Sequence, residues 1–176
     1  MTDVATVKAQ IRKAFSRGVY PGDWCLTNSR EGTEPGLLEE EFKGKTDWRT
    51  LDPSFIDQTP DGFGTALNFF SDEAFRFYLP AYLLADLDGK LSHANVVFAL
   101  THGLDNESRE KRINPQRYGE RTWFEHARHK FAIFNADEVK AIVSYLRYKL
   151  STDAVTDYEK GHINDALKSY WASRAA

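Results

Sequence analysis

The apolar segment that follows Ser71 constrains the fold more than any other part of the sequence. Between residues 72 and about 87, apolar side chains occupy more than one side of a helix, so this helix has to be buried. Ser71 is a favourable N-cap, and the two acidic residues after it suit the positive end of the helix dipole. Arg76 and Asp86 interrupt the apolar run, which is too short to cross a bilayer. The sequence therefore predicts a protein built around a central buried helix at about 71–87.

Several weaker patterns place further helices around this one. Apolar residues recur at helical spacing in residues 3–16, 135–150 and 153–172, and Asn135 with Glu138 forms a capping-box pattern. Residues 48–56 fit one or two helical turns, 94–100 favours helix, and 123–134 is ambiguous between helix and strand. The segment 66–70 is expected to be short and extended. We therefore expect a mainly α, compact fold with at most a small β element.

Size and composition predict one intracellular domain. The chain has 176 residues, of which 41% are hydrophobic and 28% charged, as in ordinary globular proteins. We expect residues 1–176 to form a single globular domain. Cys25 is the only cysteine, and the first ten residues lack the apolar stretch of a signal peptide, which favours the cytoplasm. With 23 Lys and Arg against 26 Asp and Glu, nothing indicates binding to a membrane, and nucleic acid is disfavoured.

A long polar segment at about 18–45 carries the first candidate contact surface. Glycines and prolines interrupt it, and it is expected to be an irregular acidic loop. Long loops are often functional, and Glu39, Glu40 and Glu41 make this one locally acidic. The alternative is a solvated loop or a short helix face. A tight turn is expected at 59–64, where Pro60, Asp61 and two glycines follow one another.

A basic segment supplies the second candidate surface. Seven Lys and Arg residues lie in 109–130, interleaved with Tyr118, Trp123 and Phe124. Such a pairing of cations and rings can hold an acidic partner or stack on bases. Glutamates dilute the charge, so a solvated mixed-charge surface is the alternative. Arg117 and Arg121 are the residues that we expect to contact a partner.

Few residues suggest chemistry. Glu125, His126 and His129 would share a helix face and are the candidate metal ligands, but no HExxH or CxxC pattern accompanies them. Cys25 beside Trp24 lacks an identifiable base that would activate it. Phosphate-binding loops and a GxSxG elbow are absent from the sequence, so we expect no cofactor.

The proline within the central helix marks a possible cleft. Pro80 cannot donate a backbone hydrogen bond and clashes with the carbonyl of Arg76, which should kink or break the helix. Between Tyr78 and Tyr82, such a kink would form a cleft lined by aromatic rings. The alternative is that Pro80 only bends the helix around the core.

One stretch of the chain resembles a known family. The signature Ser71-Asp-Glu-Ala-Phe-Arg-Phe-Tyr-Leu-Pro-Ala-Tyr-Leu83, preceded by Asp47-Trp48 and by Leu67-Asn-Phe-Phe70, is similar to that of a family of short bacterial proteins of unknown function. The segments 135–148 and 166–171 resemble the C-terminal half of the same family. The resemblance covers about 47–171 and implies a compact stand-alone domain. It implies no activity and no catalytic residues.

Two functions follow from these patterns. The leading one is a non-enzymatic protein-binding or regulatory domain of the adaptor or toxin-neutralising type, which contacts another protein through 31–41 or 109–130. The alternative is a metal-dependent enzyme that uses Glu125, His126 and His129. The sequence indicates neither the partner nor the oligomeric state.

Overall fold

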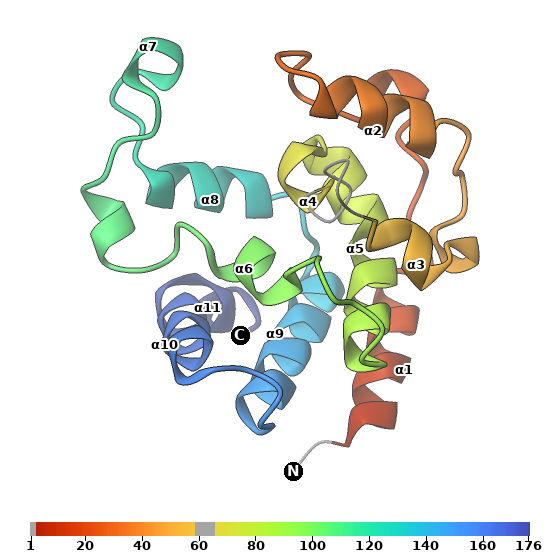
Figure 1. The fold of residues 1–176 in the computed structure, drawn as a ribbon. Coiled ribbons are helices and arrows are strands. Elements are labelled where there is room, and N and C mark those ends of the chain that lie inside the picture. The colour runs from red at the N-terminus through yellow and green to blue at the C-terminus, as the bar shows by residue number, and fades with distance from the viewer. Residues whose placement is uncertain (1–2, 59–65) are drawn as a thin grey trace. The chain divides into compact units, whose positions relative to one another are not determined.

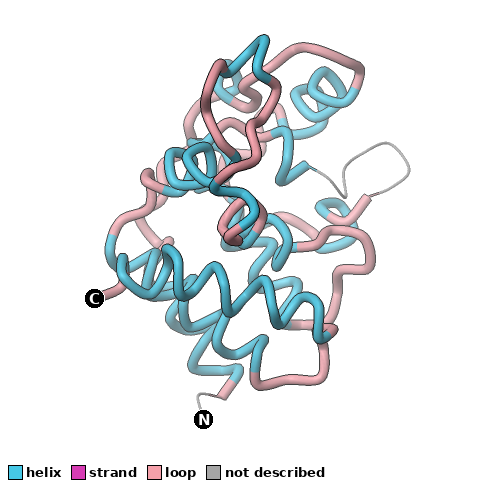
Figure 2. The backbone as a smooth tube through the Cα atoms, turned by 90° about the vertical axis from the view of Figure 1, so that its left-hand side faces the viewer, coloured by secondary structure: helices cyan, strands magenta, loops and turns pink. Residues whose placement is uncertain are grey.

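The chain folds into helices joined by loops, as the computed structural model shows for residues 3–58 and 66–176 (Figures 1 and 2). Within these ranges no strand is formed, and extended pairing is limited to two isolated bridges, Thr27 with Phe70 and Arg112 with Thr122. No helix in the same ranges has the length and apolar character needed to cross a membrane. The mainly α fold predicted from the sequence is confirmed.

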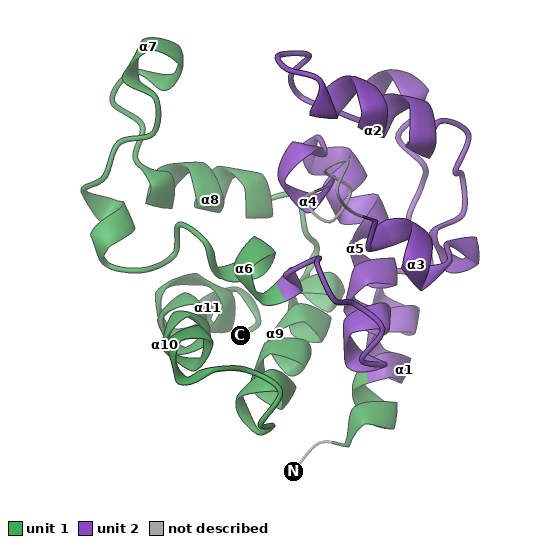
Figure 3. Cartoon of the chain, in the orientation of Figure 1, with its two compact units in different colours: residues 1–7, 97–176 green, residues 8–96 purple. Residues whose placement is uncertain are grey.

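The contacts of the chain divide it into two compact units (Figure 3). Unit 1 contains residues 1–7 and 97–176, and unit 2 contains residues 8–96. The expectation of a single domain, which implies one cooperative unfolding transition, stays a prediction.

Helix α5 (Asp72–Leu87) lies at the core of unit 2 and has the bounds that the sequence predicted. The Ser71 side chain caps it by accepting a hydrogen bond from the backbone N–H of Ala74 at 3.0 Å. The helix continues through Pro80 without a break, and the kink expected there stays a prediction. Proline costs about 3 kcal/mol in a helix interior. Burial of the turns on both sides of it, including Phe75, Tyr78 and Leu83, offsets this cost.

Aromatic rings surround the middle of α5. The ring of Phe42 lies 5.0 Å from the rings of Phe55, Phe70 and Tyr78, and it meets the last two edge to face. The Tyr78 hydroxyl donates a hydrogen bond to the Lys45 carbonyl at 2.8 Å, which satisfies its polar end inside the core. These aromatic side chains therefore pack together in the core of unit 2.

In residues 8–58 and 66–96, the shorter elements of unit 2 are α2 (Glu34–Phe42), α3 (Pro53–Ile56), α4 (Ala66–Phe69) and the 3₁₀ turns Asp23–Cys25 and Trp48–Thr50. Helix α1 (Val4–Ala14) begins in unit 1, and its residues from Lys8 onward belong to unit 2. Pro53 is the first residue of α3, where its fixed φ suits the start of a helix. Two expectations are wrong: 66–70 is mainly helical rather than extended, and part of the loop at 18–45 forms α2 and the 3₁₀ turn Asp23–Cys25. The turn expected at 59–64 lies outside the described residues.

Unit 1 is built from α6 (Val96–Thr101), whose first residue closes unit 2, and from the helices that follow it. These are α7 (Pro115–Tyr118), α8 (Trp123–Phe131), α9 (Ala136–Leu150), α10 (Asp157–Ala166) and α11 (Ala172–Arg174), together with a 3₁₀ turn at Glu107–Arg109. Thr122, Asn135 and Thr156 each form a full capping box. The last predicted helix begins at 157 rather than 153 because Thr156 caps it.

A π-helical turn, Leu167–Trp171, joins α10 to α11 and ties them to α6. The indole N–H of Trp171 donates to the Leu100 carbonyl at 2.9 Å, and the Ser169 hydroxyl donates to the Leu104 carbonyl at 2.6 Å. The Trp171 ring also lies 4.8 Å from the ring of Phe131. The wide turn therefore satisfies one carbonyl group in the last turn of α6 and one just after it, and it fills part of the core of unit 1.

Candidate functional site

The three glutamates of the acidic segment lie on α2 and do not act alike. Glu39 accepts a hydrogen bond from the Thr27 hydroxyl at 2.6 Å and lies 3.7 Å from the Arg30 guanidinium, so it holds the preceding loop. Glu40 and Glu41 are exposed on the same short helix. Glu40 and Glu41 therefore form a small acidic helix face at the surface. This matches the alternative of a short helix face that was considered for this segment.

The candidate metal ligands lie on α8, which places His126 and His129 on one side of the helix. The Glu125 carboxylate is used in the capping box, where it accepts the backbone N–H of Thr122 at 2.9 Å. Across residues 3–58 and 66–176, no group of three or more His, Cys, Asp or Glu side chains is arranged to hold a metal ion. The structure therefore does not bring these three side chains together as a metal centre.

The thiol of Cys25 has no activating neighbour among the described residues. Its sulfur lies 3.8 Å from the Ser71 hydroxyl and 3.7 Å from a Glu73 carboxylate oxygen. Burial raises the pKa of this thiol; the Ser71 hydrogen bond opposes that rise, and the negative charge of Glu73 adds to it. The net shift is upward, so the thiol stays protonated at neutral pH and is a poor nucleophile.

The residues expected to line a cleft in α5 are part of the core. Tyr78, Pro80 and Tyr82 are all buried. The Tyr82 hydroxyl has no hydrogen-bond partner among the described residues. Burial, and then the charge of Asp57, raise the pKa of Tyr82, so this phenol is neutral and unsuited to proton transfer near neutral pH.

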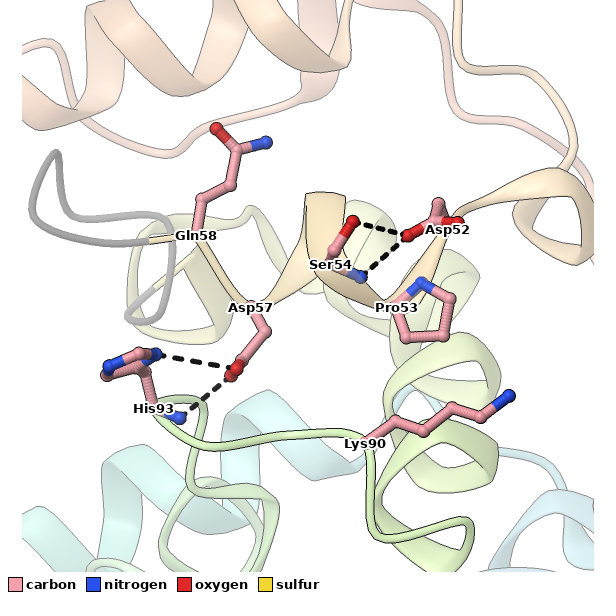
Figure 4. Close-up of a pocket in the computed structure, with 7 residues that line it drawn as sticks. All are labelled: Asp52, Pro53, Ser54, Asp57, Gln58, Lys90 and His93. Carbon is pink, nitrogen blue, oxygen red and sulfur yellow. Dashed lines mark hydrogen bonds and ion pairs between the residues drawn. The ribbon is translucent and has the colours of Figure 1, made fainter.

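A pocket of about 620 Å³ opens beside α3 in unit 2 (Figure 4). Asp57, which follows α3, lies at its centre. The Asp57 carboxylate accepts the backbone N–H groups of Ser92, His93 and Ala94 at 2.7 to 2.9 Å, and the His93 ring lies 3.4 Å away. One carboxylate thus fixes the last part of the loop before α6. The other residues that line the pocket are Asp52, Pro53, Ser54, Gln58 and Lys90.

The polar groups of this pocket do not converge on a reaction centre. The Ser54 hydroxyl donates to Asp52 rather than to His93, so a Ser–His–Asp relay is not formed (Figure 4). The Lys90 ammonium group and the His93 ring point in different directions (Figure 4). Both carboxylates are occupied by local hydrogen bonds. We therefore assign the pocket a structural role in which Asp57 stabilises a loop.

Replacing Asp57 tests this structural role. Asp57→Ala leaves three backbone N–H groups without their acceptor and should lower the free energy of unfolding by about 2–4 kcal/mol at pH 7. Burial acts to raise the pKa of Asp57, but the N–H groups of Ala94, Ser92 and His93 outweigh it and hold the pKa below the ordinary value. The stabilisation is therefore fully present above the unfolded-state pKa of about 3.9 and is lost as the pH falls through the lower folded-state pKa.

Urea denaturation measured at a series of pH values checks both parts of this prediction. The difference between the wild type and Asp57→Ala should be largest near neutral pH and should shrink in acid. Asp153→Ala, which removes an exposed aspartate, is the matched control and should change stability by less than about 0.5 kcal/mol. If the Asp57→Ala protein were as stable as this control, the Asp57 carboxylate would not stabilise the loop.

The most unusual surface of unit 1 is a continuous row of five rings. We call it the ring row, and it consists of Phe98, His102, Trp123, His126 and Tyr118 in spatial order. Successive ring centroids lie 4.7, 4.8, 6.2 and 5.6 Å apart. Phe98 keeps 47% of its surface exposed, Tyr118 and His102 are also exposed, and the other two rings are partly exposed.

Local structure explains how the ring row forms. Phe98 and His102 are four residues apart at the end of α6, and Trp123 and His126 are three apart on α8, so each pair shares one side of a helix turn. Gly103 brings the two pairs together, since it adopts a φ of +84°. A Cβ atom at this position would lie 2.9 Å from the Trp123 carbonyl oxygen. Only glycine allows so close an approach of the α6 end to α8.

Cations surround the ring row. The Arg117 guanidinium lies 5.5 Å from the centre of the Tyr118 ring, and Arg121 is exposed at the turn before α8. Two of the glutamates nearby are occupied, because Glu120 pairs with Arg112 and Glu125 caps α8. These two carboxylates are therefore engaged away from the Arg121 side chain.

The two imidazoles of the ring row are held neutral. Burial lowers the pKa of His126, and the positive charges of Lys130 and Arg121 lower it further, together with the neighbouring imidazoles of His129 and His102. Burial also lowers the pKa of His102, against the opposing effect of Asp105. The Nδ1 atom of His126 is buried and has no hydrogen-bond partner among the described residues. Each of these neighbouring groups disfavours the imidazolium form of His126, and the positive charges of Lys130 and Arg121 favour an anion at this place.

The sequence indicated residues 109–130 as a contact surface, but it did not indicate the ring row. Arg117 and Arg121 lie beside it, as expected for partner-contacting residues, whereas Phe98 and His102 were not recognised. The i, i+4 spacing of Phe98 with His102 and the i, i+3 spacing of Trp123 with His126 are the signals that could have found the two halves. Asp57 left no such signal, because its partners lie about 35 residues further along the chain.

The fold and this surface define a class: a helical protein that presents a row of exposed rings among cations. The chain belongs to a family of unknown function (DUF6714), whose model matches residues 3–175. The match includes the N-terminal helix and the acidic segment, which the resemblance seen in the sequence had left outside. Comparison with curated proteins gives no match, and comparison with solved structures gives none.

Proposed function

We propose that this protein is a non-enzymatic binding domain that contacts a protein partner through the ring row. The observation that carries the proposal is the exposure of Phe98, Tyr118 and the rings between them as one connected surface. Clustered aromatic residues with arginine are the typical energetic centre of protein interfaces. The ring row is also pre-organised by α6, α8 and Gly103, which lowers the entropy lost on binding.

The remaining observations support binding rather than catalysis. The Cys25 thiol is not activated, and the Asp57 pocket holds its carboxylates in structural hydrogen bonds. Cys25 as the only cysteine agrees with a reducing compartment, so the proposal places the domain in the cytoplasm. A role as an adaptor or as a neutralising partner of a toxin would use the same surface.

Selection from a random peptide display library tests the proposal. The wild-type protein is used for selection, and the Phe98→Ala/Trp123→Ala double variant is used for counter-selection. Enriched peptides are then synthesised and their binding is measured by fluorescence anisotropy. We expect peptides whose Kd rises about tenfold or more when either Phe98 or Trp123 is replaced by alanine.

Tyr158→Ala is the matched control for this experiment. Tyr158 is an exposed aromatic residue of unit 1 that lies outside the ring row and contacts His162. Its replacement should leave peptide binding unchanged. A library that gives no peptide dependent on Phe98 or Trp123 would refute the proposed function.

A further inference from the structure

We propose that the partner segment that binds the ring row is acidic and carries aromatic or leucine side chains, and that its carboxylates lie against Arg121 and His126. This inference rests on the proposed function and specifies the chemistry of the partner. It also implies that binding is accompanied by proton uptake at the imidazoles of the ring row.

The first argument is charge complementarity. Residues 109–130 contain seven Lys and Arg against three Glu, although the whole chain has a net charge of −3. Glu120 and Glu125 are occupied within the protein, and the Arg121 side chain has no ion-pair or hydrogen-bond partner in residues 3–58 and 66–176. A partner that supplies carboxylates would therefore meet unneutralised positive charge.

The second argument decides between a protein and a nucleic acid. Bases stack on ring faces that are free, and in single-strand-binding proteins such faces follow one another along a groove. In the ring row, Phe98 stacks on His102 with an interplanar angle of 26°, and Trp123 and Tyr118 meet their histidine neighbours at 65° to 88°. The rings cover one another's faces and leave edges, which suit aliphatic and aromatic side chains of a peptide.

The third argument is the environment of His126. Lys130 and His129 act on it from α8, Arg121 from the turn before α8, and His102 from the end of α6, while the Tyr118 ring packs on it from α7. No carboxylate is among these groups. In the free protein the pKa of His126 is lowered, so the ring is neutral at pH 7.

A carboxylate placed beside this ring favours the imidazolium, so the pKa of His126 should rise in the complex. Affinity for an acidic segment should then increase as the pH falls from about 7.5 towards 6. His102 lies next in the ring row and should contribute in the same direction, since burial also lowers its pKa. The pH dependence thus reports on a group within the proposed contact.

The experiment uses designed peptides of about 12 residues on the full-length protein. One peptide alternates glutamate with phenylalanine and leucine, a second has glutamine at each glutamate position, and a third has lysine there. Single-stranded oligo-dT of similar length is the fourth probe. Fluorescence anisotropy gives each Kd at about pH 7.5 and about pH 6.

We expect the glutamate peptide to bind about tenfold more tightly than the glutamine peptide, and Arg121→Glu to abolish this preference. Its affinity should rise about threefold or more between the two pH values for the wild type, and this rise should be reduced in His126→Gln. Binding of the glutamine or lysine peptide that equals binding of the glutamate peptide would overturn the inference. Tighter binding of oligo-dT would overturn it in favour of nucleic acid.

The two proposals fail in different ways. If a neutral or basic peptide binds and Phe98→Ala weakens it, the ring row is a protein-binding surface and only the acidic partner is wrong. If the glutamate peptide binds with the same Kd in wild type, Phe98→Ala and Trp123→Ala, the contact lies elsewhere and both proposals are wrong.

Discussion

Replacing Trp171 with alanine should lower the free energy of unfolding by about 4–6 kcal/mol and should prevent stable folding of unit 1. The Trp171 side chain has no exposed surface, and its ring packs 4.8 Å from the ring of Phe131. Truncation opens a large cavity and leaves the Leu100 carbonyl without its indole donor. Urea or guanidinium denaturation, followed by far-UV circular dichroism, measures the loss.

Two further variants keep this prediction testable if Trp171→Ala does not fold. Trp171→Phe retains much of the ring but removes the N–H donor, and it should cost about 2 kcal/mol. Trp24→Ala removes the same residue type from a position that is 82% exposed, and it should change stability by less than about 0.5 kcal/mol. If Trp171→Ala were as stable as Trp24→Ala, the account of the unit 1 core would be wrong.

Replacing Phe75 with alanine should cost about 3–5 kcal/mol in unit 2. Phe75 lies near the start of α5 and is fully buried. Its truncation leaves a cavity lined by apolar groups, and water does not fill such a cavity favourably. The same denaturation experiment measures this loss. Phe75→Leu leaves a smaller cavity, so it should lower the free energy of unfolding by less than half as much as Phe75→Ala does.

Phe98→Ala is the informative comparison for Phe75→Ala. Phe98 is 47% exposed, and its replacement should cost no more than about 1 kcal/mol. The two variants thus separate roles: one phenylalanine stabilises the fold, and the other is kept at the surface for binding. Equal destabilisation by both would mean that Phe98 is a core residue and that the ring row is not a free surface.

The elements that could be predicted from the sequence carry local signals at both ends. Helix α5 was predicted with its bounds because Ser71 caps it and Asp88 with Gly89 ends it. Helix α9 was predicted because Asn135 and Glu138 form a capping box at its start. Such signals depend on residues within one turn of each other, so no tertiary information is needed.

The elements that were missed depend on contacts made across long stretches of chain. Helix α2 begins with Pro35 and Gly36, which indicate a loop in the sequence, yet burial of Leu38 and Phe42 stabilises a helix there. Residues 66–69 are too few for periodicity to separate a helix from a strand. At α8 the Thr122–Glu125 capping box was a local signal that could have resolved the ambiguity.

The candidate site was predictable only in part, for a similar reason. The positive charge and rings of residues 109–130 are visible in the sequence, and the structure places Arg121 beside the ring row. The ring row itself requires the end of α6 to lie against α8, which depends on Gly103 and on the Leu100 and Leu104 carbonyl contacts with the π-helical turn. Nothing within either segment alone indicates that they meet.

The central claim is that the ring row is the surface that binds a partner, and the tryptophan indole N–H signals test it most directly. Trp123 is in the ring row, Trp48 and Trp171 are buried, and Trp24 is exposed in unit 2. In a ¹⁵N–¹H correlation spectrum titrated with the glutamate peptide or a selected peptide, the Trp123 signal should shift progressively while the other three stay in place. A shift of the Trp24 signal with no change at Trp123 would contradict the account.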